Sequence, residues 1–368
     1  MPEAVVQAFA MIEQQTKLYE EALSLLKKLV SIPSFSKEEH ETAGALAAFL
    51  ALKGIEHSWV GNNIFALNKH YDATKPTLLL NSHHDTVKPN IAYTLNPFDP
   101  IEKDGKLFGL GSNDAGGPLV SLLACFLYFQ QQEGLSHNLA FAATAEEEIS
   151  GPNGIEHTLK YLPPIHAAIV GEPTLMQMAI AERGLLVLDA VAHGKAGHAA
   201  RNEGKNAITL AVKDIEWFNS YLFPEVSPLL GPVKMSVTSI ETENKAHNVV
   251  PAECRFIVDI RVNECYSFEE VLEVIGKNVA SEFTPRSLRL RSSMISNEHP
   301  LVKAGLSLGR TTYGSPTTSD KALMPFPALK IGPGDSARSH SADEFIFTDE
   351  IREGINLYIE LTDKVIRP

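Results

Sequence analysis

Short, uninterrupted apolar runs constrain the fold of this chain more than any other feature of its sequence. Four of them occupy residues 77–80, 139–144, 167–170 and 328–331, and polar or charged residues follow each one directly. Strands that are apolar on both faces are typical of a largely parallel sheet covered by helices. The chain is therefore predicted to be an α/β protein whose central sheet is covered by helices on both faces.

Helices are expected between several of these runs, notably at residues 118–132, and again near the end of the chain at about 350–365. Another helix is predicted to begin at Ser36, whose hydroxyl could cap it while Glu39 reaches back in a capping box. Gly54 is expected to end that helix, because glycine is favoured just past a helix C-terminus.

Residues 185–294 follow a different order of elements. The predicted elements are a strand at 185–192, a helix at 205–220, strands at 233–240 and 252–262, a helix at 268–281 and a strand at 287–294. Ser267 and Glu270 form a capping-box pattern ahead of the second helix. This βαββαβ order is that of a ferredoxin-like unit. We therefore predict a discontinuous first domain, residues 1–183 and 295–368, interrupted by an inserted domain, residues 184–294.

Charge and cysteine usage exclude some classes of protein. The net charge of −13 argues against a nucleic-acid partner, because phosphate contacts need clustered Lys and Arg. The three cysteines, Cys125, Cys254 and Cys265, show no pairing pattern, which favours a reducing compartment. The first 30 residues are predicted to be an amphipathic helix, and no apolar stretch is long enough to span a bilayer. We therefore expect a cytoplasmic protein with no membrane and no nucleic-acid partner.

Histidines and carboxylates follow five predicted strand ends or turns. They are His83, His84 and Asp85; Asp114 after a glycine-rich turn; Glu146, Glu147 and Glu148; Glu172; and His340. Taken singly, such a histidine is more typical of a hydrogen-bonded structural residue, and such an acidic run of a solvated loop. Together at one edge of a sheet they would repel one another, so we expect divalent cations there. Imidazole and carboxylate ligands without thiolates favour a catalytic zinc site, with cobalt or manganese as substitutes.

These residues, in this order and over nearly the whole chain, resemble the zinc-dependent aminoacylases, acetylornithine deacetylases, succinyl-diaminopimelate desuccinylases and related carboxypeptidases. The resemblance implies two Zn²⁺ ions, with His83 and Glu172 binding one, Glu148 and His340 binding the other, and Asp114 bridging both. It implies that Asp85 orients His83, that Glu147 is the general base, and that the peptide bond after Asp114 is cis.

The inserted region carries a second part of the resemblance. Gly194-Lys-Ala-Gly-His198 is similar to the stretch whose histidine crosses a dimer interface and stabilises the oxyanion in the partner's active site. This implies a homodimer and a dimerisation or lid role for the inserted domain. Asn248 and Arg261 match positions that bind substrate or oxyanion. The alternatives are a surface histidine for His198 and an interface ion pair for Arg261.

The activity that the resemblance implies is metal-dependent hydrolysis of a small N-acyl amino acid. The sequence motif Ser-Asn-Asp114-Ala-Gly-Gly is most similar to the corresponding motif of the deacylases that act on acetyl- or succinyl-ornithine in arginine biosynthesis. Two alternatives remain within enzymes: succinyl-diaminopimelate desuccinylation, or a two-zinc dipeptidase or aminopeptidase. A catalytically silent metal-binding protein is the alternative from another class. Catalysis through a covalent intermediate on Ser or Cys is disfavoured, because the sequence has no Gly-x-Ser-x-Gly nucleophile elbow and no cysteine in these motifs.

Overall fold

The computed structural model describes residues 3–201 and 203–367, with side chains from residue 13 onward. The chain separates into two compact units. The first comprises the chain up to Ile180, Ile295–Tyr313 and the chain from Met324 onward; the second comprises Ala181–Met294 and Gly314–Leu323. The predicted limits did not assign residues 314–323 to the inserted part. Residues 1, 2, 202 and 368 of the predicted domains lie outside the described residues.

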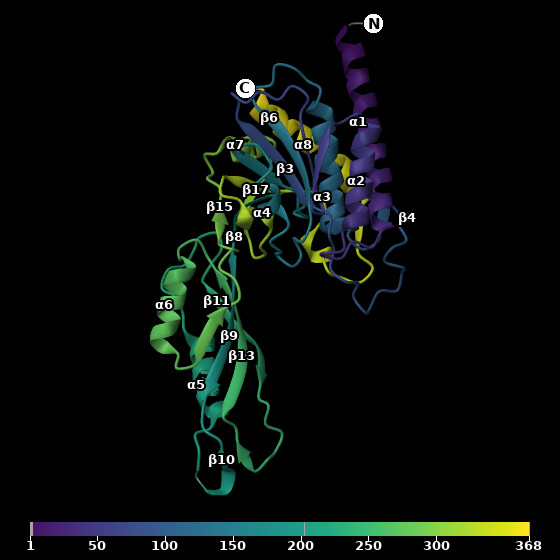
Figure 1. Cartoon of the computed structure of the whole chain (residues 1–368). Helices are drawn as coiled ribbons and strands as arrows, with labels where there is room; N and C mark the ends of the chain where they lie inside the picture. Colours follow the sequence, from purple (N-terminus) through teal and green to yellow (C-terminus); the bar gives the residue numbers. More distant parts are fainter. Residues whose placement is uncertain (1–2, 202, 368) are drawn as a thin grey trace. The chain divides into compact units, whose positions relative to one another are not determined.

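A central mixed sheet forms the core of the first unit (Figure 1). Its strands, in spatial order, are β1 (His57–Val60), β2 (Asn63–Leu67), β6 (Asn138–Thr144), β3 (Thr77–His83), β7 (Ala167–Val170), β17 (Ala328–Lys330) and β8 (Met178–Glu182). The short strands β15 (Ser293–Met294) and β16 (Thr312–Ser315) also pair with β8. Strands β6, β3, β7 and β17 are parallel, and every residue of β3 and β6 is buried. The apolar runs thus form the buried strands that the sequence predicts.

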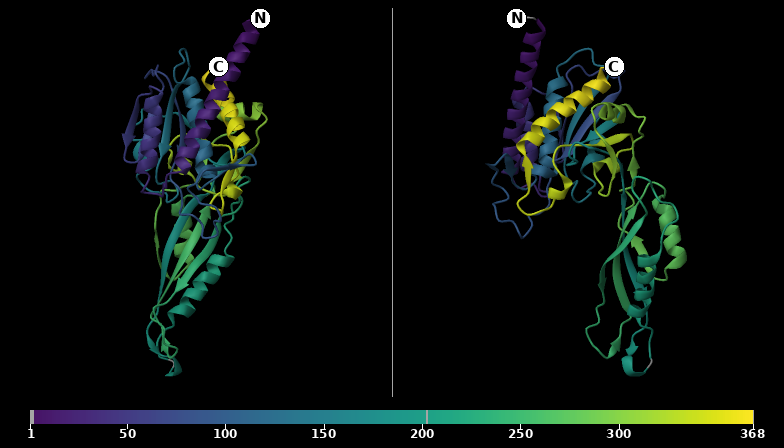
Figure 2. Two further views of the ribbon diagram at one scale, coloured as in Figure 1. Left: turned by 90° about the vertical axis from the view of Figure 1, so that its right-hand side faces the viewer. Right: turned by 180° about the vertical axis from the view of Figure 1, so that it is seen from behind.

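Helices flank this sheet, which confirms the predicted α/β class. Helix α3 (Gly117–Phe129) packs on β3 and β6. Helices α1 (Glu3–Val30) and α8 (Thr348–Ile366) pack against α3 and lie beside each other (Figure 2). The unit also contains α2 (His40–Leu52), α4 (Ile155–Thr158), α7 (Pro300–Ser307) and a small sheet of β4 (Ile101–Lys103), β5 (Lys106–Phe108) and β18 (Phe345–Phe347). None of the helices in the described part of the chain is both long and apolar enough to cross a membrane.

The predicted start of the second helix at Ser36 is wrong. Helix α2 begins at His40, and Lys37 adopts a left-handed conformation with φ of 75° that interrupts any helix from Ser36. The Ser36 hydroxyl instead donates to Asp85 Oδ2 at 2.7 Å. The Glu39 carboxylate accepts hydrogen bonds from the backbone N–H of Lys37 and of Glu146. Each of these two side chains therefore makes a contact that is distant in the sequence, Ser36 with Asp85 and Glu39 with Glu146.

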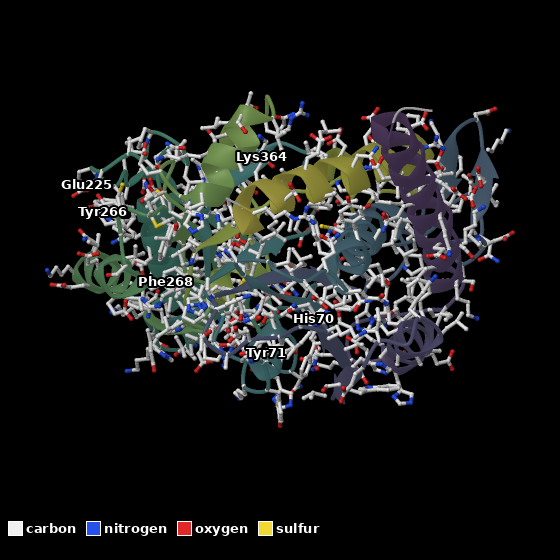
Figure 3. All side chains as sticks on the ribbon, turned by 90° about the horizontal axis from the view of Figure 1, so that it is seen from above. His70, Tyr71, Glu225, Tyr266, Phe268 and Lys364 are labelled. Carbon is white, nitrogen blue, oxygen red and sulfur yellow. The ribbon has the colours of Figure 1, made fainter. Side chains whose placement is uncertain are left out.

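The second unit contains a four-stranded antiparallel sheet in the order β11 (Lys234–Glu241), β13 (Glu253–Val262), β9 (Gly184–His193) and β14 (Glu282–Pro285). With α5 (Ala207–Ser220) and α6 (Phe268–Asn278), it has the predicted ferredoxin-like βαββαβ order. Phe218, Phe256 and Phe268 lie in its core. The Ser267–Glu270 capping box is present, and the Tyr266 hydroxyl beside it accepts the N–H of Glu225 (Figure 3).

The last strand of the four-stranded sheet lies earlier than the predicted 287–294. The observed strand, β14, ends at Pro285 and pairs antiparallel with β9. Because β14 is an edge strand, Pro285 can occupy it without removing a hydrogen bond from the interior of the sheet. A small ladder of β10 (Gly197–His198) with β12 (Val249–Val250) and a 3₁₀ turn, Ala199–Arg201, complete the unit.

Candidate metal centre

The first unit positions all of its predicted functional residues directly after strands or in turns. His83 ends β3, and Asp85 follows it. Glu146–Glu148 follow β6, and Glu172 follows β7. Asp114 lies in the turn Ser112–Gly116 that precedes α3, and His340 follows the 3₁₀ turn Ser336–Arg338. Because β3, β6 and β7 are parallel neighbours, their carboxyl ends lie at one edge of the sheet.

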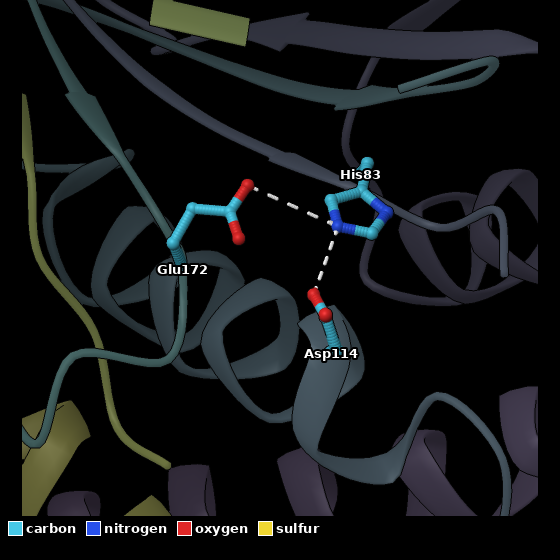
Figure 4. Close-up of side chains that lie close together, drawn as sticks. All are labelled: His83, Asp114 and Glu172. Atoms are coloured by element: carbon cyan, nitrogen blue, oxygen red, sulfur yellow. Dashed lines mark ion pairs between the residues drawn. The ribbon is translucent and has the colours of Figure 1, made fainter. Parts of the chain in front are cut away.

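The first cluster contains His83, Asp114 and Glu172, whose ligand atoms all lie within 4.8 Å of one another (Figure 4). His83 Nε2 lies 3.4 Å from Asp114 Oδ1 and 3.9 Å from Glu172 Oε1. The imidazole is buried, with 1% of its side chain exposed. The peptide bond between Asp114 and Ala115 is cis, as the resemblance predicts.

The second cluster contains Asp114 again, together with Glu148 and His340. His340 Nε2 lies 3.0 Å from Glu148 Oε2 and 3.7 Å from Asp114 Oδ2. The two oxygens of Asp114 therefore face different histidines, Oδ1 toward His83 and Oδ2 toward His340. A carboxylate in this arrangement can be shared between two cations.

The residues fit divalent cations, and His83 gives the most direct sign of this. Its Nδ1 donates to the backbone carbonyl of Asp85 at 3.0 Å, which leaves the lone pair of the neutral ring on Nε2. Nε2 is buried, yet it makes no hydrogen bond to any described residue. Two ligand atoms that are each about 2 Å from one zinc ion lie within about 4 Å of each other. The distances from His83 Nε2 and from His340 Nε2 to the carboxylate oxygens of their clusters, 3.0–3.9 Å, are within this limit.

Electrostatics also favour cations at this edge of the sheet. Two imidazoles face the carboxylates of Asp85, Asp114, Glu147, Glu148 and Glu172. The hydrogen bond that His340 donates to the Glu148 carboxylate raises the pKa of His340 to about 9, and burial raises the pKa of Glu148. Even if both histidines were protonated, their two positive charges could not balance five carboxylates, so the arrangement suits ions of higher charge.

Glu147 lies beside the first cluster, with its Oε2 3.9 Å from His83 Nε2. Asp85 holds the backbone at this point, because its two carboxylate oxygens accept the N–H groups of Glu147 at 3.1 Å and Glu148 at 3.2 Å. Asp85 therefore contacts both the β3 end, through His83, and the acidic turn after β6. Its predicted orienting role is consistent with these contacts.

His84, the neighbour of His83, has a structural environment. Its Nδ1 lies 2.9 Å from the Thr42 hydroxyl and its Nε2 lies 2.9 Å from the backbone carbonyl of Asn62. Burial lowers the pKa of His84 to about 4, so its ring is neutral near pH 7. Of the two adjacent histidines, only His83 faces the carboxylates of the two clusters.

The remaining predicted residues lie in the second unit. His198 is exposed, and its Nδ1 accepts the N–H of Ala200 at 3.2 Å. The backbone carbonyl of Asn248 accepts the N–H of Ala199. Arg261 donates two hydrogen bonds to Asp259 of the same strand, at 2.8 and 3.0 Å. The roles of His198, Asn248 and Arg261 in binding substrate stay predictions.

Sequence reasoning missed two buried acids that hold the loops of the centre. Glu39, which was assigned to a helix cap, accepts the N–H of Glu146 at 3.2 Å. Glu344 accepts N–H groups of the turn that carries Asp114. The only sequence signal for Glu344 is its position four residues after His340.

Residues 79–364, which include every residue of the two clusters, match the family described as Peptidase family M20/M25/M40. A succinyl-diaminopimelate desuccinylase 2 of Ruegeria sp. is 28% identical over 196 residues, which span 50% of each chain. A succinyl-diaminopimelate desuccinylase of Cereibacter sphaeroides is 25% identical over 334 residues, 87% of this chain and 83% of the relative.

Solved structures share the fold. Aminopeptidase PepT of Bacillus cereus superposes with a TM-score of 0.76 at 17% identity, over 94% of this chain and 98% of its own. The YXEP protein of Bacillus subtilis, described as a dinuclear metal-binding peptidase of the M20 family, gives a TM-score of 0.72 at 16% identity, over 95% and 99%.

The metal-stripped protein is expected to bind zinc more tightly as the pH rises. Because the pKa of His340 is raised from 6.5 to about 9, the ring keeps at neutral pH a proton that a cation must displace. Protonation therefore opposes binding below about pH 9, and affinity should increase from pH 6.5 toward that value. Competition with a chelator of known affinity measures this dependence, and an affinity that is constant over the range would contradict it.

Proposed function

Since this chain belongs to peptidase family M20/M25/M40 and is therefore a hydrolase of amide bonds, we propose that it removes the acyl group from the nitrogen of an N-acyl amino acid. The observation that carries this proposal is the pair of three-residue clusters that share Asp114. The relatives are named succinyl-diaminopimelate desuccinylases, and the substrate in that name is an N-acyl amino acid.

Two divalent cations fit the ligands of the centre. His83 and Glu172 would hold one ion, Glu148 and His340 the other, and Asp114 would contact both. Imidazole and carboxylate donors suit zinc, and cobalt or manganese would substitute. Such ions, when bound, lower the pKa of a water molecule and polarise a carbonyl group.

Glu147 is the general base of the proposed reaction. Its carboxylate would take a proton from the attacking water and return that proton to the departing amine nitrogen. Asp85 fixes the backbone N–H of Glu147, so the carboxylate starts from a defined position. The products are the free carboxylate of the acyl group and the free amine of the amino acid.

The second unit completes the proposed active site in a homodimer. We assign it a dimerisation or lid role, with His198 of one protomer donating a hydrogen bond to the oxyanion in the other. Asn248 and Arg261 would bind the substrate carboxylate or the oxyanion. Arg261 is paired with Asp259 in this structure, so substrate binding would require exchange of that partner.

Two kinds of N-acyl amino acid are candidate substrates, succinyl-diaminopimelate and the acyl-ornithines. The curated relatives favour succinyl-diaminopimelate, because the two that align over the ranges above carry that activity in their names. The motif Ser112-Asn-Asp-Ala-Gly-Gly117 favours N2-succinylornithine or N2-acetylornithine, because it resembles the motif of ornithine deacylases. Amine release from these substrates discriminates between the candidates.

We expect metal-stripped protein to release no amine, and protein refilled with zinc or cobalt to hydrolyse succinyl-diaminopimelate. The panel includes both acyl-ornithines and a simple dipeptide, assayed with and without a chelator. Turnover of an acyl-ornithine but not of succinyl-diaminopimelate would identify the acyl-ornithine as the substrate. Turnover of the dipeptide alone, or of none of the four, would contradict the deacylase proposal.

Glu147→Gln is expected to lower kcat by about 10²–10⁴-fold while the protein still binds both ions, because Glu147 moves a proton and is not a proposed ligand. Its matched control is Glu148→Gln, one residue later in the same turn, which should lose affinity for one ion. Metal content after dialysis separates the two variants. Loss of metal from Glu147→Gln, or unchanged turnover, would contradict the assignment.

His198→Ala is expected to stay dimeric and to lose most of its turnover. Mixing it with Glu147→Gln would test action across the interface, because a hybrid dimer contains one active site with both residues intact. Random exchange makes half of the dimers hybrid, so about a quarter of wild-type activity should return. A mixture that stays inactive, or a fully active His198→Ala dimer, would contradict the role of His198.

A further inference from the structure

Glu344 lies almost fully buried in the first unit, with 2% of its surface exposed. Its carboxylate accepts three backbone N–H groups: Oε2 accepts that of Gly111 at 3.1 Å, and Oε1 accepts those of Asn113 and Asp114, each at 2.9 Å. Its backbone carbonyl accepts a fourth, from Gly109. One residue therefore binds nearly the whole turn that leads into Asp114.

This contact depends on the backbone of the turn. Gly111 has a φ of 76°, in the left-handed region, and a Cβ there would lie 2.6 Å from Thr86 Cγ2. Glycine is favoured at such a position because it has no Cβ. The turn can thus direct several N–H groups toward one carboxylate, as in the backbone nests that bind anions.

The segment that carries Glu344 is itself held in place. The Asp343 carboxylate accepts the N–H groups of Thr94 at 2.8 Å and Leu95 at 2.9 Å. His340, the proposed ligand of the second ion, precedes Glu344 by four residues. Glu344 therefore connects the loop of the terminal ligand His340 to the turn of the shared ligand Asp114.

The geometry of Asp114 shows why such a connection matters. Its Oδ1 lies 3.4 Å from His83 Nε2 and its Oδ2 lies 3.7 Å from His340 Nε2 (Figure 4 shows the His83 side). A rotation of the carboxylate would move both oxygens away from their two clusters at once. The hydrogen bond to the Asp114 N–H fixes the backbone from which that side chain projects.

The burial of Glu344 has a cost that its contacts must offset. Desolvation, together with the charge of Asp114, raises the pKa of Glu344 to about 8, whereas its three N–H donors act in the opposite direction. A glutamine of the same size would avoid the burial of charge. Its amide group, however, would present N–H donors to N–H donors, so only a carboxylate can accept from both sides of the turn.

We propose that Glu344 is a positioning residue, which fixes the shared ligand Asp114 for two divalent cations through the backbone N–H groups of Gly111, Asn113 and Asp114. This inference rests on the proposed function, because it assumes that Asp114 binds cations. Glu344 acts through Asp114 and contacts neither cation nor substrate itself.

The test compares Glu344→Gln with Asp214→Asn as a matched control. Asp214 is a buried carboxylate of the second unit, 6% exposed, that accepts the N–H groups of Ala280 and Ser281 at 3.2 and 2.8 Å. Loss of either carboxylate removes backbone hydrogen bonds and should lower stability. Only Glu344→Gln should weaken the affinity for zinc, by about 10–100-fold, as changes to residues that orient metal ligands do.

Three readouts apply to the full chain. Calorimetric titration gives zinc affinity, and the visible absorption of the cobalt-loaded protein reports ligand geometry. Amide hydrogen exchange in the metal-free protein reports Gly111, Asn113 and Asp114 directly, and should become faster in Glu344→Gln. Glu344→Asp, which keeps the charge on a shorter side chain, should restore part of the zinc affinity and the cobalt spectrum.

Wild-type zinc affinity and an unaltered cobalt spectrum in Glu344→Gln would overturn the proposal, as would an equal loss of affinity in Asp214→Asn. If Glu344→Gln does not fold, Glu344→Asp decides, since wild-type affinity in that variant would also overturn it. If the wild-type protein binds neither zinc nor cobalt, the proposed function fails. The exchange experiment then still tests the anchoring, because unchanged exchange at Gly111, Asn113 and Asp114 would show that Glu344 does not hold the turn.

Discussion

The concentration of negative charge at one edge of the central sheet is the constraint on which the rest of the first unit depends. Asp114, Glu147, Glu148 and Glu172 lie around His83 and His340, with Asp85 fully buried beneath them. Carboxylates so close together repel one another and resist desolvation, so they stay near each other only if the scaffold holds them and cations compensate them. The buried parallel strands β3, β6 and β7 provide that scaffold, because their ends cannot move apart without breaking the sheet.

A second set of buried acids holds the loops that carry the first. Asp85 accepts the N–H groups of Glu147 and Glu148, Glu39 accepts that of Glu146, and Glu344 accepts those of Gly111, Asn113 and Asp114. These carboxylates satisfy backbone donors, which orients the loops and leaves the carboxylates of the two clusters available for cations. Stability of the loops and geometry of the centre are thus produced by the same hydrogen bonds.

The proposed metal ligands all lie in the first unit, and the second unit folds around a core of its own. The first contains the complete set of proposed ligands, and the second has its own core around Phe218, Phe256 and Phe268 and its own helix cap at Ser267. Proteins similar to this chain in sequence or in fold are named for different amide substrates, among them succinyl-diaminopimelate and peptides. A shared fold therefore does not fix the substrate, which depends on the side chains of the individual site.

The sequence by itself determined the α/β class and the βαββαβ unit, and it indicated candidate residues at strand ends, because parallel strands bring their carboxyl ends together. Which of these candidates form the two clusters followed from the resemblance to a known family. The sequence also marked the capping box of α6, which involves residues only three positions apart. Only the tertiary structure decided the remaining points. Ser36 and Glu39 read as a helix cap but serve Asp85 and the Glu146 turn, and Glu344 reaches a turn more than 200 residues earlier in the chain. Such contacts join residues that no local pattern relates, so they become visible only when the chain has folded.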